Sequence, residues 1–264
     1  NGTPTNEKDD IVTYRTEFVD QNNNHILPNQ IYTIAQDKNN VIWIGTDDGI
    51  LAIPPQVDFT KSNSCIRVII PRNDGTNLGD YLLDNEQIND IQIDGANRLW
   101  VGTANSGIFL LEPTMEDVAH PNYYVETVAH FTTENSILPS DAIMSIAIQQ
   151  STGEVFIGTG GGLVSYMSDA SEPENDLKQI EVYPNPVRPD YGGYITFEGL
   201  MENTELRIVD ANGSLVRVIQ SNGGTATWDA KNAQGGRVAS GVYTAIGNTQ
   251  DGQAHGTVKV LIMN

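Results

Sequence analysis

Residues able to do chemistry are few in this sequence, and their spacing fits no common catalytic motif. The run Gly158 to Gly162 comes nearest to a phosphate-binding loop, but no Gly-Lys-Ser/Thr follows it and no helical pattern would present backbone amides. The carboxylate pairs Asp9-Asp10 and Asp47-Asp48 are adjacent in sequence, so on a strand or turn their side chains point apart. No Gly-x-Ser-x-Gly motif is present. The sequence therefore predicts a protein that is not an enzyme, with no catalytic residue and no cofactor.

Residues that bind metals elsewhere also point to structural roles. The four histidines lack the paired spacing of a metal site; they are His25, His120, His130 and His255. The loops Asp20 to Asn24 and Asp37 to Asn40 hold enough oxygen atoms for calcium, yet they miss the spacing of a twelve-residue calcium loop. Turn formation explains both loops equally well. Cys65 lies in an apolar run without a nearby base, which indicates a small core residue.

Charge and length exclude some classes of protein. The 264 residues include 34 acidic and 14 basic side chains, for a net charge of −20. Such a surface repels a phosphate backbone, so nucleic acid is excluded as a partner. No apolar run is long enough to span a membrane. The balance suits a soluble extracellular protein, and the length allows two ordinary domains.

One motif, apolar-aromatic-apolar-Gly-Thr, occurs three times and predicts how the chain is built. Its copies are Val41 to Thr46, Leu99 to Thr103 and Val155 to Thr159. Each copy has strand-like runs on both sides, separated by turn residues, and Ser64 to Ile70 and Val125 to Phe131 fit an outer fourth strand. Four short strands per repeat are typical of a β-propeller blade. We expect the aromatic and glycine positions to be core residues between blades: Trp43, Gly45, Trp100, Gly102, Phe156 and Gly158.

Three blades are too few to close a propeller, which needs four or more. We therefore expect residues 1–167 to be the C-terminal part of a longer ring. The same residues resemble the two-component-regulator propeller repeat of Bacteroidetes, in which an Ile-Leu-Pro segment precedes the motif, as at Ile26-Leu27-Pro28 and Ile137-Leu138-Pro139. That resemblance implies the propeller fold and says little about function.

The composition changes at residues 168–177, which are acidic and indicate a solvated linker. Residues 178–264 then carry about seven short β-rich runs, which favour a β-sandwich. The clearest element is a hairpin around Asp210-Ala211-Asn212-Gly213, because both Asn and Gly tolerate positive φ. The predicted fold is thus all-β: a partial propeller followed by a sandwich.

The tail resembles the type A C-terminal sorting domain of type IX secretion. The resemblance is carried by Val182-Tyr183-Pro184-Asn185-Pro186, by Trp228-Asp229 and by Val238 to Tyr243. It implies an Ig-like sandwich and export through the periplasm to the outer-membrane surface of a Bacteroidetes bacterium. The sorting residues it implies are Gly241, Val242, Tyr243, Thr257, Val258, Lys259, Val260, Leu261 and Ile262.

Together the two resemblances imply a non-enzymatic surface component of the type IX secretion and sortase machinery. The implied partners are a PorU-like sortase, a PorV-like shuttle and, as a ligand, anionic lipopolysaccharide, although a net charge of −20 is unfavourable for an anionic glycan. The alternative is a secreted cargo protein, with an enzyme or adhesin upstream, whose tail is only a sorting signal. A sensor ectodomain of a hybrid two-component regulator fits less well, because a sorting tail follows the blades.

Overall fold

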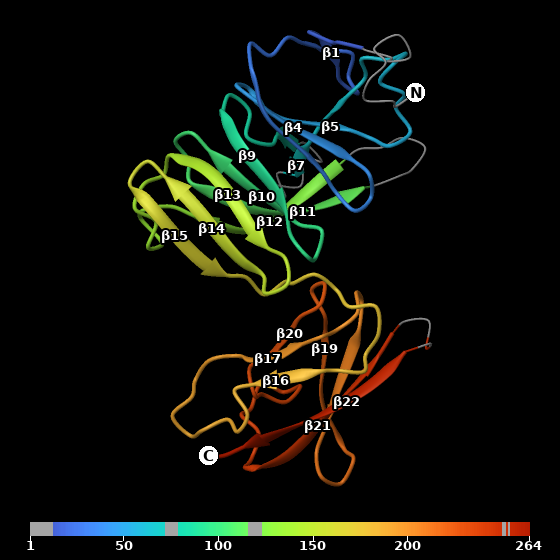
Figure 1. Ribbon diagram of the computed structural model, residues 1–264, viewed down its shortest axis with the longest axis vertical. Coiled ribbons are helices and arrows are strands. Elements are labelled where there is room, and N and C mark those ends of the chain that lie inside the picture. The colour runs from blue at the N-terminus through green and yellow to red at the C-terminus, as the bar shows by residue number, and fades with distance from the viewer. Residues whose placement is uncertain (1–12, 72–78, 116–122, 250–251, 253) are drawn as a thin grey trace, which may run out of the picture. The chain divides into compact units, whose positions relative to one another are not determined.

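The computed structural model describes residues 13–71, 79–115, 123–249, 252 and 254–264, and in this part of the chain it consists of β-strands without a helix. The predicted all-β class is confirmed. Two compact units are present, and each is described by itself (Figure 1). Unit 1 comprises Asn1–Ile93, Leu99–Ile146 and Ile157–Val164, and unit 2 comprises Asp94–Arg98, Ala147–Phe156 and Ser165–Asn264.

The first sheet of unit 1 is the blade expected around the first copy of the motif. It is antiparallel, with the order β3-β4-β5-β6. Its strands are β3 (Ile31–Gln36), β4 (Ile42–Thr46), β5 (Gly49–Ile53) and β6 (Ile66–Arg67). A separate two-stranded sheet, β1 (Phe18–Val19) with β2 (His25–Ile26), precedes it.

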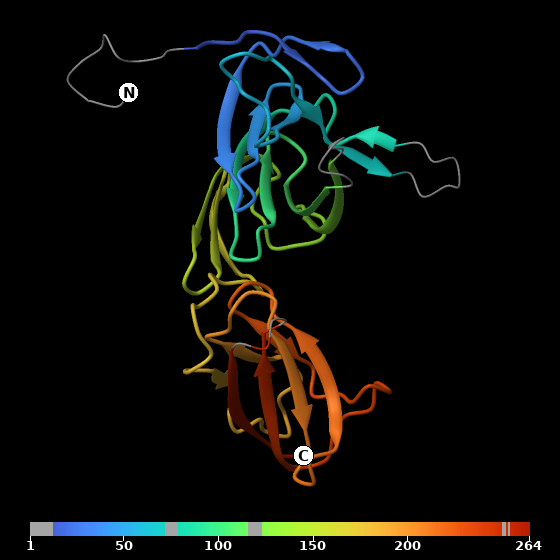
Figure 2. The ribbon, with the colours of Figure 1, turned by 90° about the vertical axis from the view of Figure 1, so that its right-hand side faces the viewer.

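The second sheet has the order β8-β7-β12-β11-β10-β9 and holds the second copy. Its blade strands are β9 (Ile88–Ile93), β10 (Leu99–Thr103), β11 (Ile108–Met115) and β12 (Tyr123–Phe131). The hairpin of β7 (Ile69–Pro71) and β8 (Gly79–Tyr81) joins it, because β7 pairs in parallel with β12. Figure 2 shows this hairpin, in cyan, extending from unit 1. The outer strand expected at Ser64 to Ile70 is therefore split between two sheets.

The third sheet, of order β13-β14-β15, holds the third copy, and its strands are shared between the two units. They are β13 (Ile143–Gln149), β14 (Glu154–Thr159) and β15 (Gly162–Met167). Trp43 and Trp100 of the first two copies are completely buried, whereas Phe156 of the third is only partly buried.

Adjacent blades of unit 1 pack through their strand-end glycines. A Cβ on Gly45 would lie 2.7 Å from Cγ2 of Ile88, the first residue of the next blade. A Cβ on Gly102 would lie 2.5 Å from Cγ2 of Ile143, which holds the same position one blade further. The glycine of each motif copy thus gives the next blade room to approach, and Ile88 and Ile143 are completely buried there.

Unit 2 contains two antiparallel sheets with a common core. One has the order β16-β17-β20 and the other β19-β18-β21-β22. The strands are β16 (Glu181–Tyr183), β17 (Ile195–Glu198), β18 (Glu205–Val209), β19 (Leu215–Gln220), β20 (Ala226–Trp228), β21 (Gly241–Asn248) and β22 (His255–Ile262). Phe197 and Trp228 from the first sheet pack with Ile208 and Val260 from the second. The Ig-like character expected for this tail stays a prediction.

The predicted hairpin at residues 210–213 is confirmed, but its turn geometry differs from the expectation. Only Gly213 has a positive φ, of 82°, and Asn212 does not. The carboxylate of Asp210 accepts hydrogen bonds from the backbone amides of Asn212 and Ser214 at 2.8 and 2.9 Å. This Asp-capped turn holds the loop, and the register shifts by one residue between Ile208 and Val209.

The segment expected to be a solvated linker is partly buried within unit 2. Ala170 and Ser171 are almost inaccessible to solvent. The Ser171 hydroxyl lies 2.6 Å from that of Thr225, and the Ser171 carbonyl accepts a hydrogen bond from the Gly224 amide at 2.8 Å. Acidic composition therefore coexists with backbone packing, which small side chains permit. The boundaries 1–167, 168–177 and 178–264 stay predictions.

The blade contact predicts the effect of adding one methyl group. We expect Gly102→Ala to lower the free energy of unfolding of unit 1 by about 1–3 kcal/mol, because the new Cβ overlaps Ile143. Gly160→Ala is the matched control, since its Cβ would meet no atom closer than 3.5 Å. Urea unfolding followed by tryptophan fluorescence measures both variants. Equal stability of the two would contradict the packing role of Gly102.

Candidate functional site: the blade turns and the terminal strand

The aspartate before each tryptophan of the motif organises a turn. Asp37 accepts hydrogen bonds at one oxygen from the amides of Asn39 and Val41, and at the other from the indole Nε1 of Trp43 at 3.0 Å. The second copy keeps the arrangement with a different donor: the Nε of Arg98 lies 2.8 Å from Asp94. These carboxylates are thus engaged in turn formation.

The threonine of each motif copy closes the following turn in the same way. Thr46, Thr103 and Thr159 each donate a side-chain hydrogen bond to a carbonyl three or four residues later, at 2.8–2.9 Å. The run Gly158 to Gly162, the nearest resemblance to a phosphate loop, is therefore the turn of the third copy. It is equivalent to the turn at residues 46–49 of the first copy.

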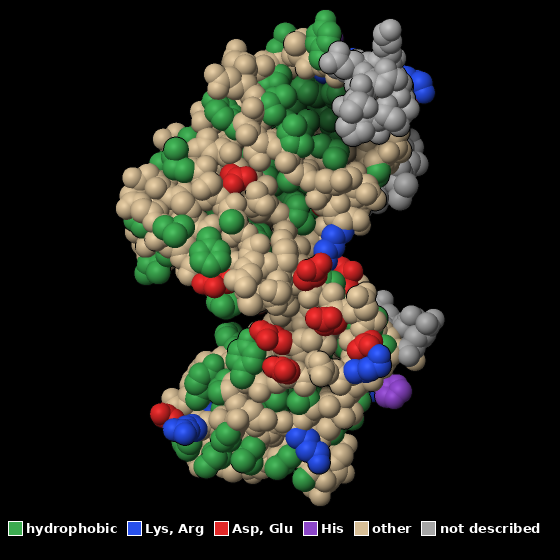
Figure 3. All heavy atoms as spheres, viewed as in Figure 1, with side chains coloured by type: hydrophobic (Ala, Val, Ile, Leu, Met, Phe, Trp, Pro, Cys, Tyr) green, Lys and Arg blue, Asp and Glu red, His purple; other side chains and the backbone are tan. Residues whose placement is uncertain are grey.

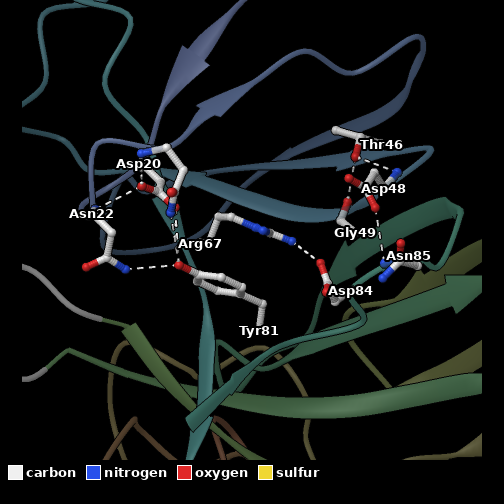
Figure 4. A network of polar contacts seen from close by, with 10 residues as sticks. Asp20, Asn22, Thr46, Asp48, Gly49, Arg67, Tyr81, Asp84 and Asn85 are labelled. Carbon is white, nitrogen blue, oxygen red and sulfur yellow. Dashed lines mark hydrogen bonds and ion pairs between the residues drawn. The ribbon is translucent and has the colours of Figure 1, made fainter. Parts of the chain in front are cut away.

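The turns of the first two copies also contact the segment that leads into the next blade. The amide of Gly49 donates to the carbonyl of Glu86 at 2.8 Å, and the amide of Gly107 donates to the carbonyl of Asp141 at 2.9 Å. Figure 4 shows the first of these turns, where Asp48 accepts a hydrogen bond from the amide of Asn85 at 3.1 Å. The polar residues of the motif thus set the spacing between blades.

A second polar cluster of unit 1 ties the β1–β2 turn to β8 (Figure 4). Asp20 is buried and accepts hydrogen bonds from the amides of Asn22 and Asn24, both at 2.8 Å, and from the hydroxyl of Tyr81 at 3.3 Å. The guanidinium of Arg67 stacks 3.9 Å from the centre of the Tyr81 ring. The cluster fixes elements that the sequence spreads over sixty residues.

Burial acts on the titratable groups in this region. Burial alone raises the pKa of Asp20, but hydrogen bonds from Asn24, Asn22 and Tyr81 outweigh it, so the pKa lies below its usual value of 3.8. For Cys65, burial and the nearby charge of Asp20 raise the pKa of the thiol to about 12. The thiol is neutral and buried, as expected for a core residue.

The expected sorting residues lie on two paired strands at one edge of unit 2. Gly241 pairs with Ile262, Val242 with Leu261 and Tyr243 with Val260. Residues alternate between the core, such as Val260 and Ile262, and the outer face of the sheet. Four of the expected sorting residues lie on the outer face: Val242, Thr257, Lys259 and Leu261.

The outer edge of β22 is closed by the segment after β16, a feature that motif matching did not assign. The side chain of Asn185 donates to the carbonyl of Lys259 at 2.9 Å and accepts from the amide of Leu261 at 3.0 Å. Next to it, the amide of Val187 donates to the carbonyl of Leu261 at 2.8 Å. One side-chain amide thus replaces a strand residue, and an Asn between two prolines is the sequence signal for it.

No metal site is evident among the residues that the structure describes: nowhere do three His, Cys, Asp or Glu side chains gather as ligands. His25 contacts Glu17, His130 stacks on Phe109 with ring centres 3.8 Å apart, and His255 begins β22. His120 and the pair Asp9-Asp10 lie outside the described residues. In the same part of the chain, no helix is long and apolar enough to cross a membrane.

Known proteins share both the repeats and the fold of the chain. Residues 25–48 and 82–105 match the family described as two-component regulator propeller, which confirms the first two copies. No curated protein sequence matches significantly. Among solved structures, PorZ of Porphyromonas gingivalis, described as an essential bacterial surface component of the type-IX secretion system, matches with 30% identity and a TM-score of 0.64. The chain is similar to PorZ.

The PorZ match covers 100% of this chain and 34% of PorZ, so the chain spans about a third of the length of that protein. Two extracellular domains from B. thetaiotaomicron are more distant. One, from a one-component system, has 16% identity and a TM-score of 0.28 over 92% of this chain and 32% of its own. The other, from a hybrid two-component system, has 12% identity and a TM-score of 0.33, and the match covers 90% of this chain and 32% of that domain's chain. TM-scores this low do not establish a shared fold.

The hydrogen bonds of Asp20 predict a dependence of stability on pH. Because the folded pKa lies below the unfolded value, the carboxylate stabilises unit 1 above the unfolded pKa, and this contribution is lost as the pH falls through the folded pKa. We expect Asp20→Asn to lower the free energy of unfolding by about 1–3 kcal/mol at pH 7. The difference from the wild type should shrink at acidic pH. Urea unfolding at both pH values checks this, with the exposed Asp190→Asn as the control; a difference independent of pH would disprove it.

The two hydrogen bonds between the Asn185 side chain and β22 predict a local change in hydrogen exchange. We expect Asn185→Ala to speed hydrogen exchange of the Leu261 amide about tenfold, because that amide loses its acceptor. Asn212→Ala, in the exposed hairpin turn, should leave the exchange unchanged. If the Leu261 amide is equally protected in Asn185→Ala, the Asn185 side chain does not stabilise the edge of β22.

Proposed function

We propose that this chain is part of a non-enzymatic cell-surface component of the type IX secretion machinery, with a role related to that of PorZ. The observation that carries the proposal is the similarity to PorZ over the whole chain. The propeller repeats at residues 25–48 and 82–105 support the propeller fold on which the proposal builds. The polar residues of the motif are engaged in turns, which is consistent with a binding rather than a catalytic role.

The three sheets would belong to a larger propeller. On β3, Ile34 is 63% exposed, and on β15, Leu163 is 72% exposed. Each is a large apolar side chain on a sheet face that a further blade would cover, just as the second sheet covers the inner side chains of the first. The 34% share of PorZ that the chain spans is consistent with further blades.

The tail would be an Ig-like type A sorting domain that directs export through the periplasm to the outer-membrane surface. Two sheets over one core, and a terminal strand that alternates between core and surface, support this assignment. The terminal strand β22 and its neighbour β21 then serve two purposes. Val260 and Ile262 hold the tail together, while Val242 and Leu261 offer a shallow apolar surface to the export machinery.

The proposed protein partners are a PorU-like sortase and a PorV-like shuttle. Anionic lipopolysaccharide is the ligand that the resemblance implies, and the net charge of −20 works against it. A locally basic surface, or one on further blades, would have to bind such a glycan. The alternative function is that of a secreted cargo protein whose tail is only a sorting signal.

The sorting role can be tested without unfolding the tail. In a type IX-competent Bacteroidetes host, we expect Val242→Ser/Leu261→Ser to accumulate in the periplasm, because both side chains face outward and pair across strands. Leu215→Ser/Val218→Ser removes two exposed apolar groups from β19 of the same sheet and should still reach the surface. Surface labelling with fractionation measures both; equal delivery would reject the assigned sorting residues.

The choice between machinery component and cargo needs a different measurement. A component should retain β22 on the cell surface, detected by mass spectrometry of Thr257 to Ile262, and should be captured with a sortase after cross-linking. A cargo protein should lose the tail and show no sortase. The second result would reject the proposed function.

A further inference from the structure

Unit 2 has a hollow of about 460 Å³ lined by tyrosine, threonine and carboxylate side chains. Its floor is the outward face of the sheet β16-β17-β20. The strand residues on the opposite face, such as Phe197 and Trp228, belong to the core. Because side chains alternate along a strand, the residues between them face away from the core and into the hollow. Figure 3 shows hydrophobic and acidic side chains next to each other on the face that carries β16 and β17.

The floor is a regular row rather than a chance gathering of side chains. Tyr183 pairs directly with Thr196, and Thr196 pairs with Thr227 on the next strand. The three side chains therefore lie side by side across the sheet. The Tyr183 hydroxyl also donates to the carboxylate of Glu198, which restrains the ring.

Two more tyrosines, Tyr194 and Tyr166, line the hollow. Tyr194 precedes β17 and is 63% exposed, Tyr166 on β15 is 43% exposed, and Tyr183 itself is 44% exposed. Each ring presents an apolar body with a polar edge and loses little conformational entropy on binding. Partly exposed rings around a hollow are suited to a flat ligand with both apolar and hydroxyl-bearing faces.

The charge of the lining narrows the class of ligand. Among the described residues that line the hollow there is no Lys or Arg, so an anionic ligand finds no counter-charge. The carboxylate of Asp169 is bonded to Arg98 and to Asn222, at 2.8 and 2.9 Å, but Arg98 also pairs with Asp94, so the lining keeps a negative charge. An anion is therefore repelled, whereas a neutral ligand with several hydroxyl groups can use the carboxylates and threonines as hydrogen-bond partners.

The volume of the hollow falls in the range of small-molecule sites and exceeds what one ammonium group needs, which favours a larger ligand. We propose that this tyrosine-lined hollow binds a short neutral saccharide, with pyranose rings stacked on Tyr194 and Tyr183. Sugar hydroxyls would bond to Glu198 and to the hydroxyls of Thr196 and Thr227. The proposal does not rest on the proposed secretion function, because it uses only the residues of unit 2.

The test is a binding measurement on the whole chain with defined probes. Neutral trisaccharides of glucose, mannose, galactose and N-acetylglucosamine are titrated by saturation-transfer NMR, next to trigalacturonate and tetramethylammonium. We expect at least one neutral probe to bind, and Tyr194→Ala or Tyr183→Ala to weaken that binding about tenfold through the loss of ring contact. Tyr14→Ala removes a more exposed ring outside the hollow and should leave the affinity unchanged.

Four results would overturn the proposal. No neutral probe binds; only trigalacturonate binds; only tetramethylammonium binds; or neutral binding survives both tyrosine variants and therefore occurs elsewhere. Circular dichroism of the variants separates loss of contact from loss of fold, and Tyr183→Phe, which keeps the ring, should retain most of the affinity.

Discussion

The close approach of one blade to the next at a strand-end glycine is the contact on which unit 1 depends. Gly45 and Gly102 leave room for Ile88 and Ile143, and these isoleucines are completely buried as a result. Any side chain at the glycine would hold the blades apart and open the core between them. The tryptophan two residues earlier can be buried only because the blades lie this close.

The polar residues around that contact are structural for the same reason. The polar residues of the motif lie at the turns of the blades, and buried turns need internal partners. The aspartate and threonine of the motif supply them, as Asp37 does for the Trp43 indole. Residues whose types suggest chemistry are therefore engaged in the architecture, and binding surfaces must be sought elsewhere.

Unit 2 has such surfaces, because each of its sheets packs on one face only. The outward face of β21 and β22 carries the expected sorting residues, and the outward face of β16-β17-β20 carries the tyrosine row. Asn185 closes the edge of β22, so the backbone of that strand is not free to pair with another chain along residues 259–261. Recognition of a folded tail would then use side chains on the sheet face.

The sequence by itself determined the features that depend on local pattern. The repeated motif predicted the blades and their buried tryptophans, and the Asn-Gly run predicted the hairpin at β18 and β19. Only the tertiary structure decided which residues meet across long separations: Asn185 with Leu261, Asp20 with Tyr81, and the tyrosines around one hollow. The physical reason is that periodicity records which face of a strand is buried, whereas strand order and register decide its neighbours. A segment such as residues 168–177 shows the limit, because an acidic composition does not reveal that the backbone of Ala170 and Ser171 is buried.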